Sequence, residues 1–472
     1  MQRFTNKRRR KIAGDIKRKI FRVVFSVLFL GFLLVACSTP AAQVEDGETT
    51  TPTMVSEAGA AFTIQAEENL RAPLSALYTR FTEGEDPVFV ESGADIQAVN
   101  GYEMNTNRPE IPATFLENAV LIPLTESRPA ADFITFAISA DGQQALIDGG
   151  FLPTAVTITD QAGKEVTIQQ PVRRVISSYG PTTGFVYNVG AEDRLVSASY
   201  LGARDPMGAS VMEKIDPRFP GIMGDEQFSQ SEFNIEEAAI LNPDLILTSA
   251  RSAWLETAGQ LDIPIVLYDA ETPKRLKEAV LLTGQLFGPN ASAQAQAWVA
   301  YYDSVINRVS DQTAEIPSAE QQRVLFTGTE PLRVASGDMY QTFIIESAGG
   351  VSVSAELDGY WNDVNLEQVA IWEPDVIIVP PYGGASVGAI TDSEEWQILS
   401  AVQAGQVYRM PKLVIPWDTP VPDSVLGVVW MAQRLYPDLV DLDCAAEAEY
   451  FYNTYYDYAL TAEEIDTICA FE

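Results

Sequence analysis

Histidine is absent from this chain of 472 residues, and cysteine occurs only three times, at Cys37, Cys444 and Cys469. The lack of histidine excludes Ser-His-Asp and Cys-His catalysis, the H-E-x-x-H zinc site and any His-ligated zinc, manganese or haem. Three cysteines are too few for a Cys₄ zinc site or a Cys-ligated iron–sulfur cluster. We therefore expect no catalytic residue, no metal ligand set and no resident cofactor.

Basic side chains are also scarce, because 31 Lys and Arg stand against 65 Asp and Glu, for a net charge of −34. Such a surface repels a phosphate backbone, so nucleic acid is not an expected partner. The acidic exterior is expected to serve solubility. The length suits two or three domains, each with a core of its own.

The amino terminus departs from this acidic composition. Residues 1–36 hold ten of the basic side chains and one acid, Asp15, and they end in an apolar stretch, Val23–Ala36. That stretch is shorter than the roughly 20 residues of a membrane span and is typical of a signal peptide. An uncleaved signal anchor is the alternative.

The sequence Leu34-Val35-Ala36-Cys37 resembles the lipobox of bacterial lipoproteins. The resemblance implies lipid attachment at Cys37 and a protein anchored to the cell membrane on its outer side, in the periplasm or at the cell surface. Residues 37–60 have little to bury and are interpreted as a flexible tether. In that oxidising compartment Cys444 and Cys469 can form a disulfide in the C-terminal tail, residues 441–472; two buried free thiols are the alternative.

Residues 61–153 alternate short apolar strands with helical patterns. We expect strands near 62–65 and 119–124, with helices over 70–81, 129–136 and 141–147. The segment, which ends in Gly149-Gly150-Phe151-Leu152-Pro153, resembles the C-terminal part of molybdate-type extracellular solute-binding proteins. It has less than half of the residues that the complete two-lobed fold of that family needs. We interpret it as a reduced, non-binding remnant, with a working oxyanion site as the alternative.

The remainder predicts an α/β fold with two Rossmann-like lobes. A hairpin over 157–168 opens an N-terminal lobe, residues 154–272, in which short buried strands alternate with helices, as in a parallel sheet covered on both faces. The longest helical tract, 273–311, lies in a connecting region, residues 273–322. A second lobe follows at 323–440. Two lobes joined by one long helix leave room for one cleft.

Two segments repeat each other across the lobes. The first runs from Asn234 through Glu236 to Pro243-Asp244, and the second from Asn365 through Glu367 to Pro374-Asp375. Asn can cap a helix, a first-turn Glu favours the helix dipole, and Pro-Asp ends the helix before a buried strand. A fold-building unit used twice explains Asn, Pro and Asp, but it does not require Glu at the same place in both copies.

Residues 155–440 resemble the iron–siderophore and vitamin B12 binding proteins that serve ABC importers. The resemblance rests on the opening hairpin, Arg174-Val175-Ile176-Ser177, Gly190-Ala191-Glu192-Asp193, both repeated units and 401–408. It implies a rigid inter-lobe helix, a permease dimer with its ATPase as partners, a metal chelate as ligand, and a monomer. It also implies that Glu236 and Glu367, one on each lobe, dock on arginines of the permease. Simple helix capping is the alternative role for both.

The cleft of such a protein is lined by loops at the C-terminal ends of strands. Trp361 and Tyr200 match a cleft tryptophan and tyrosine of the B12-binding relatives, whereas Gln230 and Ser249 stand where those relatives have tryptophan. Aromatic faces and an arginine suit a bulky chelate, and core packing is the alternative for Tyr382. The candidate ligand-binding residues are Tyr179, Tyr200, Ser249, Arg251, Ser336, Asp338, Tyr360, Trp361, Tyr382 and Trp417.

The sequence therefore predicts a lipid-anchored receptor that binds an iron–siderophore, corrinoid or haem chelate between two lobes and delivers it to an ABC importer. It is not expected to be an enzyme. An extracellular carboxylate-dependent hydrolase is the first alternative, since glycoside hydrolysis needs only two carboxylates. A receptor that senses the same ligand without transporting it is the second.

Overall fold

The computed structural model describes residues 62–101, 112–199, 206–224, 227–258 and 261–469. The expected signal peptide, the tether, Cys37 and Tyr200 lie outside these ranges. Within them, no helix combines the length and apolar character that crossing a membrane requires.

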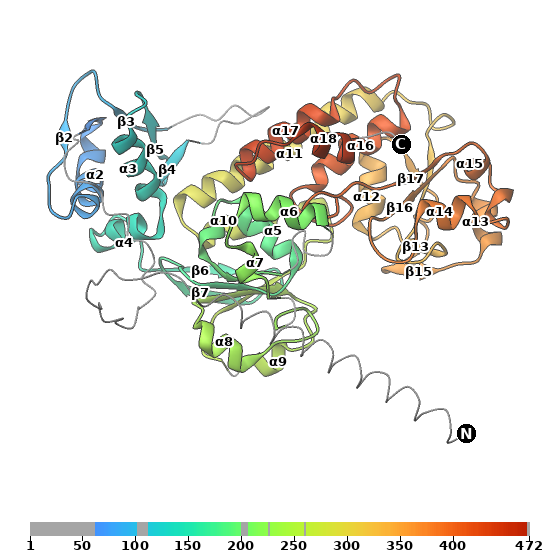
Figure 1. Cartoon of the computed structure of the whole chain (residues 1–472), viewed down its shortest axis with the longest axis horizontal. Helices are drawn as coiled ribbons and strands as arrows, with labels where there is room; N and C mark the ends of the chain where they lie inside the picture. The colour runs from blue at the N-terminus through green and yellow to red at the C-terminus, as the bar shows by residue number, and fades with distance from the viewer. Residues whose placement is uncertain (1–61, 102–111, 200–205, 225–226, 259–260, 470–472) are drawn as a thin grey trace, which may run out of the picture. The chain divides into compact units, whose positions relative to one another are not determined.

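A small α/β domain opens the described chain (Figure 1). Its five-stranded sheet has the order β2-β1-β3-β5-β4, with β1 parallel to both neighbours and β5 antiparallel to both of its own. Leu70, Leu74 and Leu77 lie on one face of α2 and are buried, as their spacing predicts. The elements are β1 (Thr63–Ala66), α2 (Glu68–Phe81), β2 (Val88–Phe89), β3 (Ile96–Asn100), β4 (Ala113–Leu116), β5 (Ala119–Pro123), α3 (Arg128–Ile138) and α4 (Ala140–Asp148).

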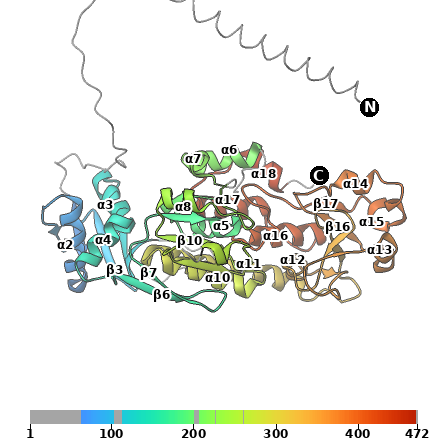
Figure 2. The ribbon, with the colours of Figure 1, turned by 90° about the horizontal axis from the view of Figure 1, so that it is seen from below.

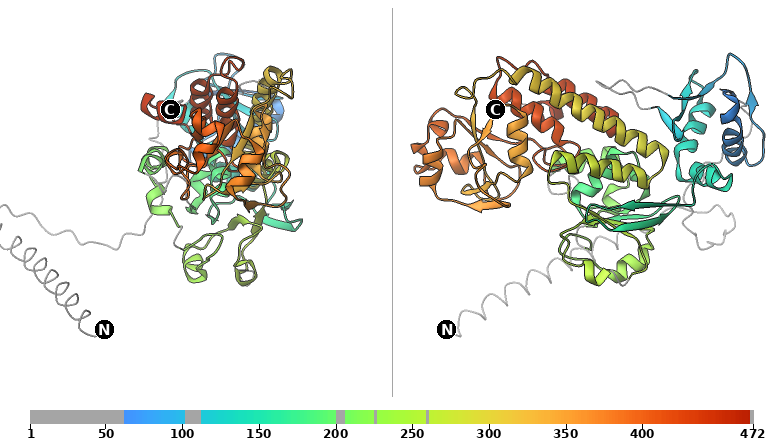
Figure 3. Two further views of the ribbon diagram at one scale, coloured as in Figure 1. Left: turned by 90° about the vertical axis from the view of Figure 1, so that its right-hand side faces the viewer. Right: turned by 180° about the vertical axis from the view of Figure 1, so that it is seen from behind.

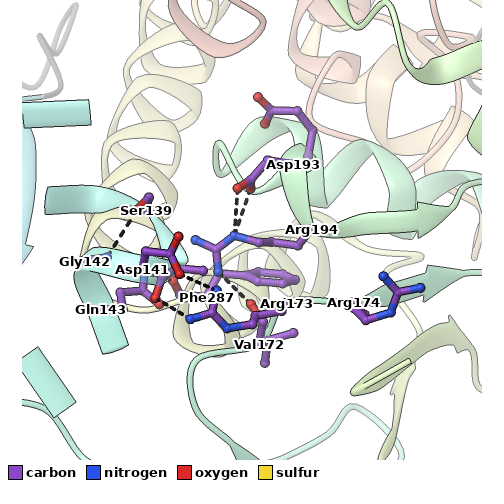
Figure 4. Close-up of polar contacts among 12 residues, drawn as sticks. Ser139, Asp141, Gly142, Gln143, Val172, Arg173, Arg174, Asp193, Arg194 and Phe287 are labelled. Atoms are coloured by element: carbon purple, nitrogen blue, oxygen red, sulfur yellow. Dashed lines mark hydrogen bonds and ion pairs between the residues drawn. The ribbon is translucent and has the colours of Figure 1, made fainter. Parts of the chain in front are cut away.

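Helix α4 joins this domain to the next (Figure 4). Ser139 ends α3 and caps α4, because its hydroxyl accepts from the N–H of Gly142 at 3.2 Å. Asp141 then pairs with Arg173 at 2.8 Å, and the buried Gln143 side chain donates to the carbonyl of Phe287 at 2.7 Å. These contacts fasten the small domain to the N-terminal lobe and to the start of the connecting helix.

The N-terminal lobe has a parallel sheet of order β11-β10-β8-β9, as the alternation of strands and helices predicts. It is preceded by the expected hairpin, β6 paired antiparallel with β7, which Figure 2 shows along its length. The elements are β6 (Ala155–Thr159), β7 (Glu165–Gln169), β8 (Val175–Ser177), α5 (Gly180–Asn188), η1 (Glu192–Arg194), β9 (Leu195–Ser197), α6 (Pro206–Ile215), α7 (Phe219–Ile222), α8 (Ile235–Leu241), β10 (Leu245–Ser249), α9 (Leu255–Ala258), β11 (Ile265–Tyr268) and α10 (Pro273–Leu286).

The helical tract expected over 273–311 is two helices rather than one. Gly288 adopts a φ of 94°, a left-handed conformation that glycine tolerates, and so separates α10 from α11 (Pro289–Thr313). Pro289 then starts the second helix, where its missing N–H costs nothing. Helix α11 alone leads from one lobe to the other, and Figure 3 shows it from behind as the long yellow helix beside α10.

The C-terminal lobe repeats the plan, with a parallel sheet of order β14-β12-β16-β17. Trp372, Trp396 and Trp430 are buried in its core, as helical patterns predict for them. The elements are β12 (Arg323–Phe326), β13 (Arg333–Ala335), α12 (Tyr340–Ser347), β14 (Val351–Ser352), β15 (Trp361–Asp363), α13 (Leu366–Trp372), β16 (Val376–Val379), α14 (Val387–Thr391), η2 (Trp396–Ile398), α15 (Ser400–Gln403), β17 (Val407–Arg409) and α16 (Ser424–Leu435).

The C-terminal tail is helical and reinforces the connection between the lobes. Cys444 and Cys469 form a disulfide between α17 (Cys444–Tyr455) and α18 (Ala462–Cys469). The buried Glu447 of α17 accepts from Arg308 of α11 at 2.7 Å, and Glu464 of α18 pairs with Lys214 of the N-terminal lobe at 3.0 Å. The lobes are therefore held by α11 and by the returning tail together, which limits hinge opening more than one helix would.

Candidate functional site

The two repeated segments form two short helices of the same design, α8 and α13, which Figure 1 labels. Asn234 caps α8 by accepting from the N–H of Glu237 at 3.1 Å, and Asn365 caps α13 by accepting from the N–H of Gln368 at 2.8 Å. Each helix ends at a left-handed residue, Asn242 with φ 43° and Glu373 with φ 43°. The sequence echo is therefore also a structural one.

An arginine clamps the end of each helix. Arg174, just before β8, donates to the carbonyl of Leu241 at 2.6 Å, and Arg323, at the start of β12, donates to that of Trp372 at 2.7 Å. The main-chain N–H groups of these arginines donate to Asp244 and Asp375, both at 2.9 Å. The Pro-Asp aspartates thus hold helix and strand together. Each clamp has a sequence signal that was not used for prediction, an Arg-Val pair at the start of a strand: Arg174-Val175 at β8 and Arg323-Val324 at β12.

Glu236 and Glu367 occupy the second position of their helices and are exposed. Within the described residues, neither carboxylate takes part in a hydrogen bond or an ion pair. The neighbouring asparagines cap the two helices, so capping does not explain why a glutamate follows each of them. Exposure of both is what a docking role requires.

Arg251 and Tyr360 bring the two lobes into contact. The Arg251 guanidinium, in the loop after β10, donates to the Tyr360 hydroxyl at 2.6 Å and lies 5.2 Å from the centre of its ring. Arg251 also pairs with Glu271 and, at 3.7 Å, with Asp269, which both follow β11. Although partial burial opposes its charge, bonding to Glu271 and the nearby Tyr179 and Tyr360 raise the pKa of Arg251. The positive charge of Arg251 is therefore balanced by two carboxylates of its own lobe, Asp269 and Glu271.

Two serines shape the loops that present this pair. Ser249 is 1% exposed, and its hydroxyl accepts from the N–H of Arg251 at 3.1 Å. Ser336 is fully buried and donates to the carbonyl of Gly359, whose N–H donates to Asp338 at 2.8 Å. Both serines are buried, and these hydrogen bonds of their hydroxyls are made within the fold; their role as ligand contacts stays a prediction. Asp338 is exposed, and by accepting from the N–H of Gly359 its carboxylate holds the loop that carries Tyr360.

The predicted aromatic residues divide into two groups. Trp361 is half-buried and packs against the backbone of Gly328, where a Cβ would come within 2.8 Å of its ring. Trp417 is fully buried, in part because Gly427 of α16 leaves room for it. The prediction that Trp417 lines the cleft is therefore wrong. Tyr360 is 53% exposed, and Tyr179 is half-buried near Arg251.

Tyr382 contacts the buried carboxyl group of Asp418, which the sequence places beside Trp417 among the loop residues of the expected cleft. The Tyr382 hydroxyl donates to Asp418 at 2.6 Å, and the Gln341 amide donates to the same oxygen at 3.3 Å. Burial raises the pKa of Asp418 to about 6, although both hydrogen bonds oppose that rise. Tyr382 is half-buried and follows β16, whereas Tyr360 directly precedes β15 of the two-stranded sheet β13-β15.

A separate cavity of about 440 Å³ lies where the small domain meets the N-terminal lobe. Its polar lining consists mainly of neutral side chains, among them Gln143, Gln170, Gln285 and Gln296, with Glu117 as its one charged residue. Among its lining residues this cavity offers neutral hydrogen-bonding side chains and no cation. Among the described residues no group of three or more Asp, Glu or Cys side chains could hold a metal ion.

Comparison with known proteins fits this architecture. The family model described as periplasmic binding protein matches residues 175–413, which include α8, α13 and both sheets, over about half of the chain. The chain belongs to the periplasmic binding protein family. It is a solute-binding protein of the kind that serves ABC transporters, and its family places its work outside the cytoplasm.

Individual relatives agree on the fold and differ in cargo. The molybdate-binding protein MolA of Haemophilus influenzae is 24% identical over 63% of this chain and 91% of its own. A vitamin B12-binding protein of Yersinia pestis is 28% identical over 44% of this chain and 70% of its own. The crystal structure of a periplasmic solute-binding protein from Veillonella parvula aligns with a TM-score of 0.59 and 25% identity, over 66% of this chain and 96% of its own. These relatives are binding proteins rather than enzymes.

Proposed function

We propose that this periplasmic binding protein is a lipid-anchored receptor that binds a bulky metal chelate, an iron–siderophore complex or a corrinoid, between its lobes and delivers it to an ABC permease dimer. The anchor is the lipid on Cys37 that the lipobox resemblance implies. The observation that carries the choice of ligand is the contact of Arg251 with Tyr360 across the lobes, with Arg251 already neutralised by Asp269 and Glu271.

A cation with free charge would favour a small oxyanion such as molybdate. Arg251 does not offer one, because two carboxylates share it. The same loops offer aromatic rings, Tyr360 and Trp361 above all, whose faces can stack on a macrocycle or on catecholate rings. Asp338 adds an acidic group at the same place. The exposed rings support a large chelate with flat faces over a bare oxyanion.

The test is a comparison of three probes. Cyanocobalamin, an iron–catecholate chelate and molybdate should be titrated separately into the purified protein, followed by intrinsic tryptophan fluorescence and calorimetry. Native mass spectrometry and absorbance of protein purified from its own host would supplement them, since chelates of iron and corrinoids are coloured. Binding of either chelate in the micromolar range or tighter is expected. Tight binding of molybdate alone would overturn the choice of ligand.

Docking on the permease is the second part of the proposal, and it rests on the exposed, unpaired Glu236 and Glu367. The double variant Glu236→Ala/Glu367→Ala should lose uptake while ligand affinity stays within a few-fold. Glu237→Gln is a matched control, because Glu237 lies in the same helix turn and its counterpart in the other lobe is Gln368. Normal uptake by the double variant would remove the docking role. Loss of the favourable interaction between each glutamate and the helix dipole would by itself cost each helix only about 0.3–1 kcal/mol.

A further inference from the structure

The two most exposed large hydrophobic side chains among the described residues are Ile240, at 75%, and Ile371, at 74%. They occupy the same position in the two repeated helices, since each stands four residues after its glutamate, Glu236 or Glu367. Residues four apart in a helix lie on one face. Each lobe therefore presents an exposed carboxylate and an exposed isoleucine side by side.

The other features that the two helices share have local explanations. The asparagines cap the helices. The aspartates that follow the helices, Asp244 and Asp375, accept from the main-chain N–H groups of Arg174 and Arg323 at 2.9 Å. The buried residues of the two helices differ: α8 buries Ala238, whereas α13 buries Val369 and Trp372. Glu and Ile are thus repeated although neither contributes to the interior of its lobe. Single exposed hydrophobic residues are ordinary, but a matched pair calls for a common cause.

We infer that Ile240 and Ile371 are the apolar anchors of the permease interface, each filling a pocket beside the basic residue that receives the neighbouring glutamate. This inference rests on the proposed function and extends it to the chemistry of the partner. The partner is a two-fold symmetric membrane protein that presents, twice, an apolar pocket next to an arginine or lysine. An apolar anchor enclosed by a charge pair is the usual form of a strongly contributing contact at an interface.

Charge selects this partner over two other occupants. A second copy of the chain would place glutamates of like charge against one another around the isoleucines, at a net charge of −34 per chain. A membrane surface of anionic lipid would repel the same carboxylates. A basic protein surface is the occupant that satisfies both the carboxylate and the isoleucine.

The experiment measures docking directly. The unliganded protein, without its lipid, is titrated onto its permease–ATPase complex in nanodiscs, as wild type, Ile240→Ser, Ile371→Ser and the double variant. Each single change should weaken docking about 3- to 10-fold and the double change at least 30-fold, with the salt dependence retained. Ile398→Ser is the matched control, because Ile398 is 61% exposed outside the repeated helices, and it should dock as wild type does. Unchanged thermal unfolding would show that every variant is folded.

The outcomes separate this inference from the docking role of the glutamates. If the double isoleucine variant docks normally while Glu236→Ala/Glu367→Ala does not, the inference is overturned and the proposed function stands. If neither pair affects docking, both are overturned. Isoleucine-dependent dimerisation in analytical ultracentrifugation, or isoleucine-dependent binding to phosphatidylglycerol vesicles that contain no permease, would assign the pair to another occupant and overturn the inference.

Discussion

Arg251 of the N-terminal lobe donates to the hydroxyl of Tyr360 of the C-terminal lobe at 2.6 Å, with its guanidinium 5.2 Å from the centre of the tyrosine ring. One residue of each lobe thus forms a contact between the loops where a ligand is expected. The loops of both residues are set by buried serines, Ser249 and Ser336, so the pair is positioned by the interior of each lobe.

The first prediction concerns this contact. Arg251→Ala and Tyr360→Ala should be coupled, because each removes the same hydrogen bond and ring contact. A double-mutant cycle in urea unfolding should give a coupling of about 0.5–1 kcal/mol. Tyr360→Phe keeps the ring and should retain part of it. Strict additivity of the two alanine changes would show that the contact contributes nothing to holding the lobes together.

The second prediction concerns Trp361. Its half-buried ring lies beside Tyr360, and Trp361→Ala should weaken binding of the chelate by roughly 1–3 kcal/mol if one face stacks on the ligand. Calorimetry with the probe that binds the wild type measures the change. Trp396→Phe, at a buried position in the same lobe, serves as the control and should leave affinity unchanged. An unaltered affinity of Trp361→Ala would place this residue outside the ligand site.

The third prediction concerns the clamp at the end of α13. Arg323→Ala removes the hydrogen bond to the carbonyl of Trp372 at 2.7 Å and should lower the free energy of unfolding by about 1–2 kcal/mol. Arg333→Ala is the control, because Arg333 is an exposed residue of β13 and its loss should change the free energy by less than about 0.5 kcal/mol. Equal stability of the two variants would contradict the clamp.

The fourth prediction concerns pH. Asp423 is fully buried and accepts from Tyr452 and Tyr456, both at 2.9 Å, and burial raises its pKa from 3.8 to about 6 despite these bonds. The folded state then holds the proton more tightly than the unfolded state. Its stabilisation is complete below pH 3.8 and is lost as the pH rises through 6, at no more than about 1.4 kcal/mol per pH unit.

Urea unfolding from below pH 3.8 to just above pH 6 tests the contribution of Asp423. The wild type should lose stability from this group as the pH rises, and Asp423→Asn should flatten the profile because its side chain does not titrate. Asp418, whose pKa burial also raises to about 6, acts in the same direction. A profile that is equally steep in wild type and variant would exclude Asp423 as a source of the pH dependence.

The fifth prediction concerns the disulfide. Cys444 and Cys469 are 25 residues apart, and closing a loop of that length is worth about 3 kcal/mol in the chain-entropy model. Cys444→Ser/Cys469→Ser should lose about that much, measured by thermal unfolding. Reductant should lower the midpoint of the wild type and leave the double variant unaffected. A reductant-insensitive wild type would contradict a stabilising role for the bond.

Much of the fold could be predicted from local sequence. Leu70, Leu74 and Leu77 recur at helical spacing, and they form the buried face of α2. The short apolar runs at 245–249 and 376–379 became central strands, because residues buried on both faces of a parallel sheet read as continuous apolar segments. Pro289 is the breaker inside the connecting tract, and α11 begins there, but the left-handed conformation of Gly288 that separates the two helices is visible only in the structure.

The candidate site was predictable only in part. Both repeated helices and both glutamates follow from the sequence echo, because capping and helix ends are local matters of a few residues. The burial of Trp417, Ser249 and Ser336 depends on segments far from them in the sequence. The sequence cannot show that Trp417 is buried beside Gly427 of α16, nor that the Ser336 hydroxyl donates to the carbonyl of Gly359, 23 residues away.

The sequence by itself determined the absence of histidine chemistry, the α/β pattern and the repeated N-x-E units, since composition and periodicity depend on neighbours along the chain. Only the tertiary structure decided that Arg251 meets Tyr360 and is neutralised by Asp269 and Glu271, and that Ile240 and Ile371 are left exposed. Burial and pairing depend on segments far apart in sequence, which packing brings together and which no local pattern specifies.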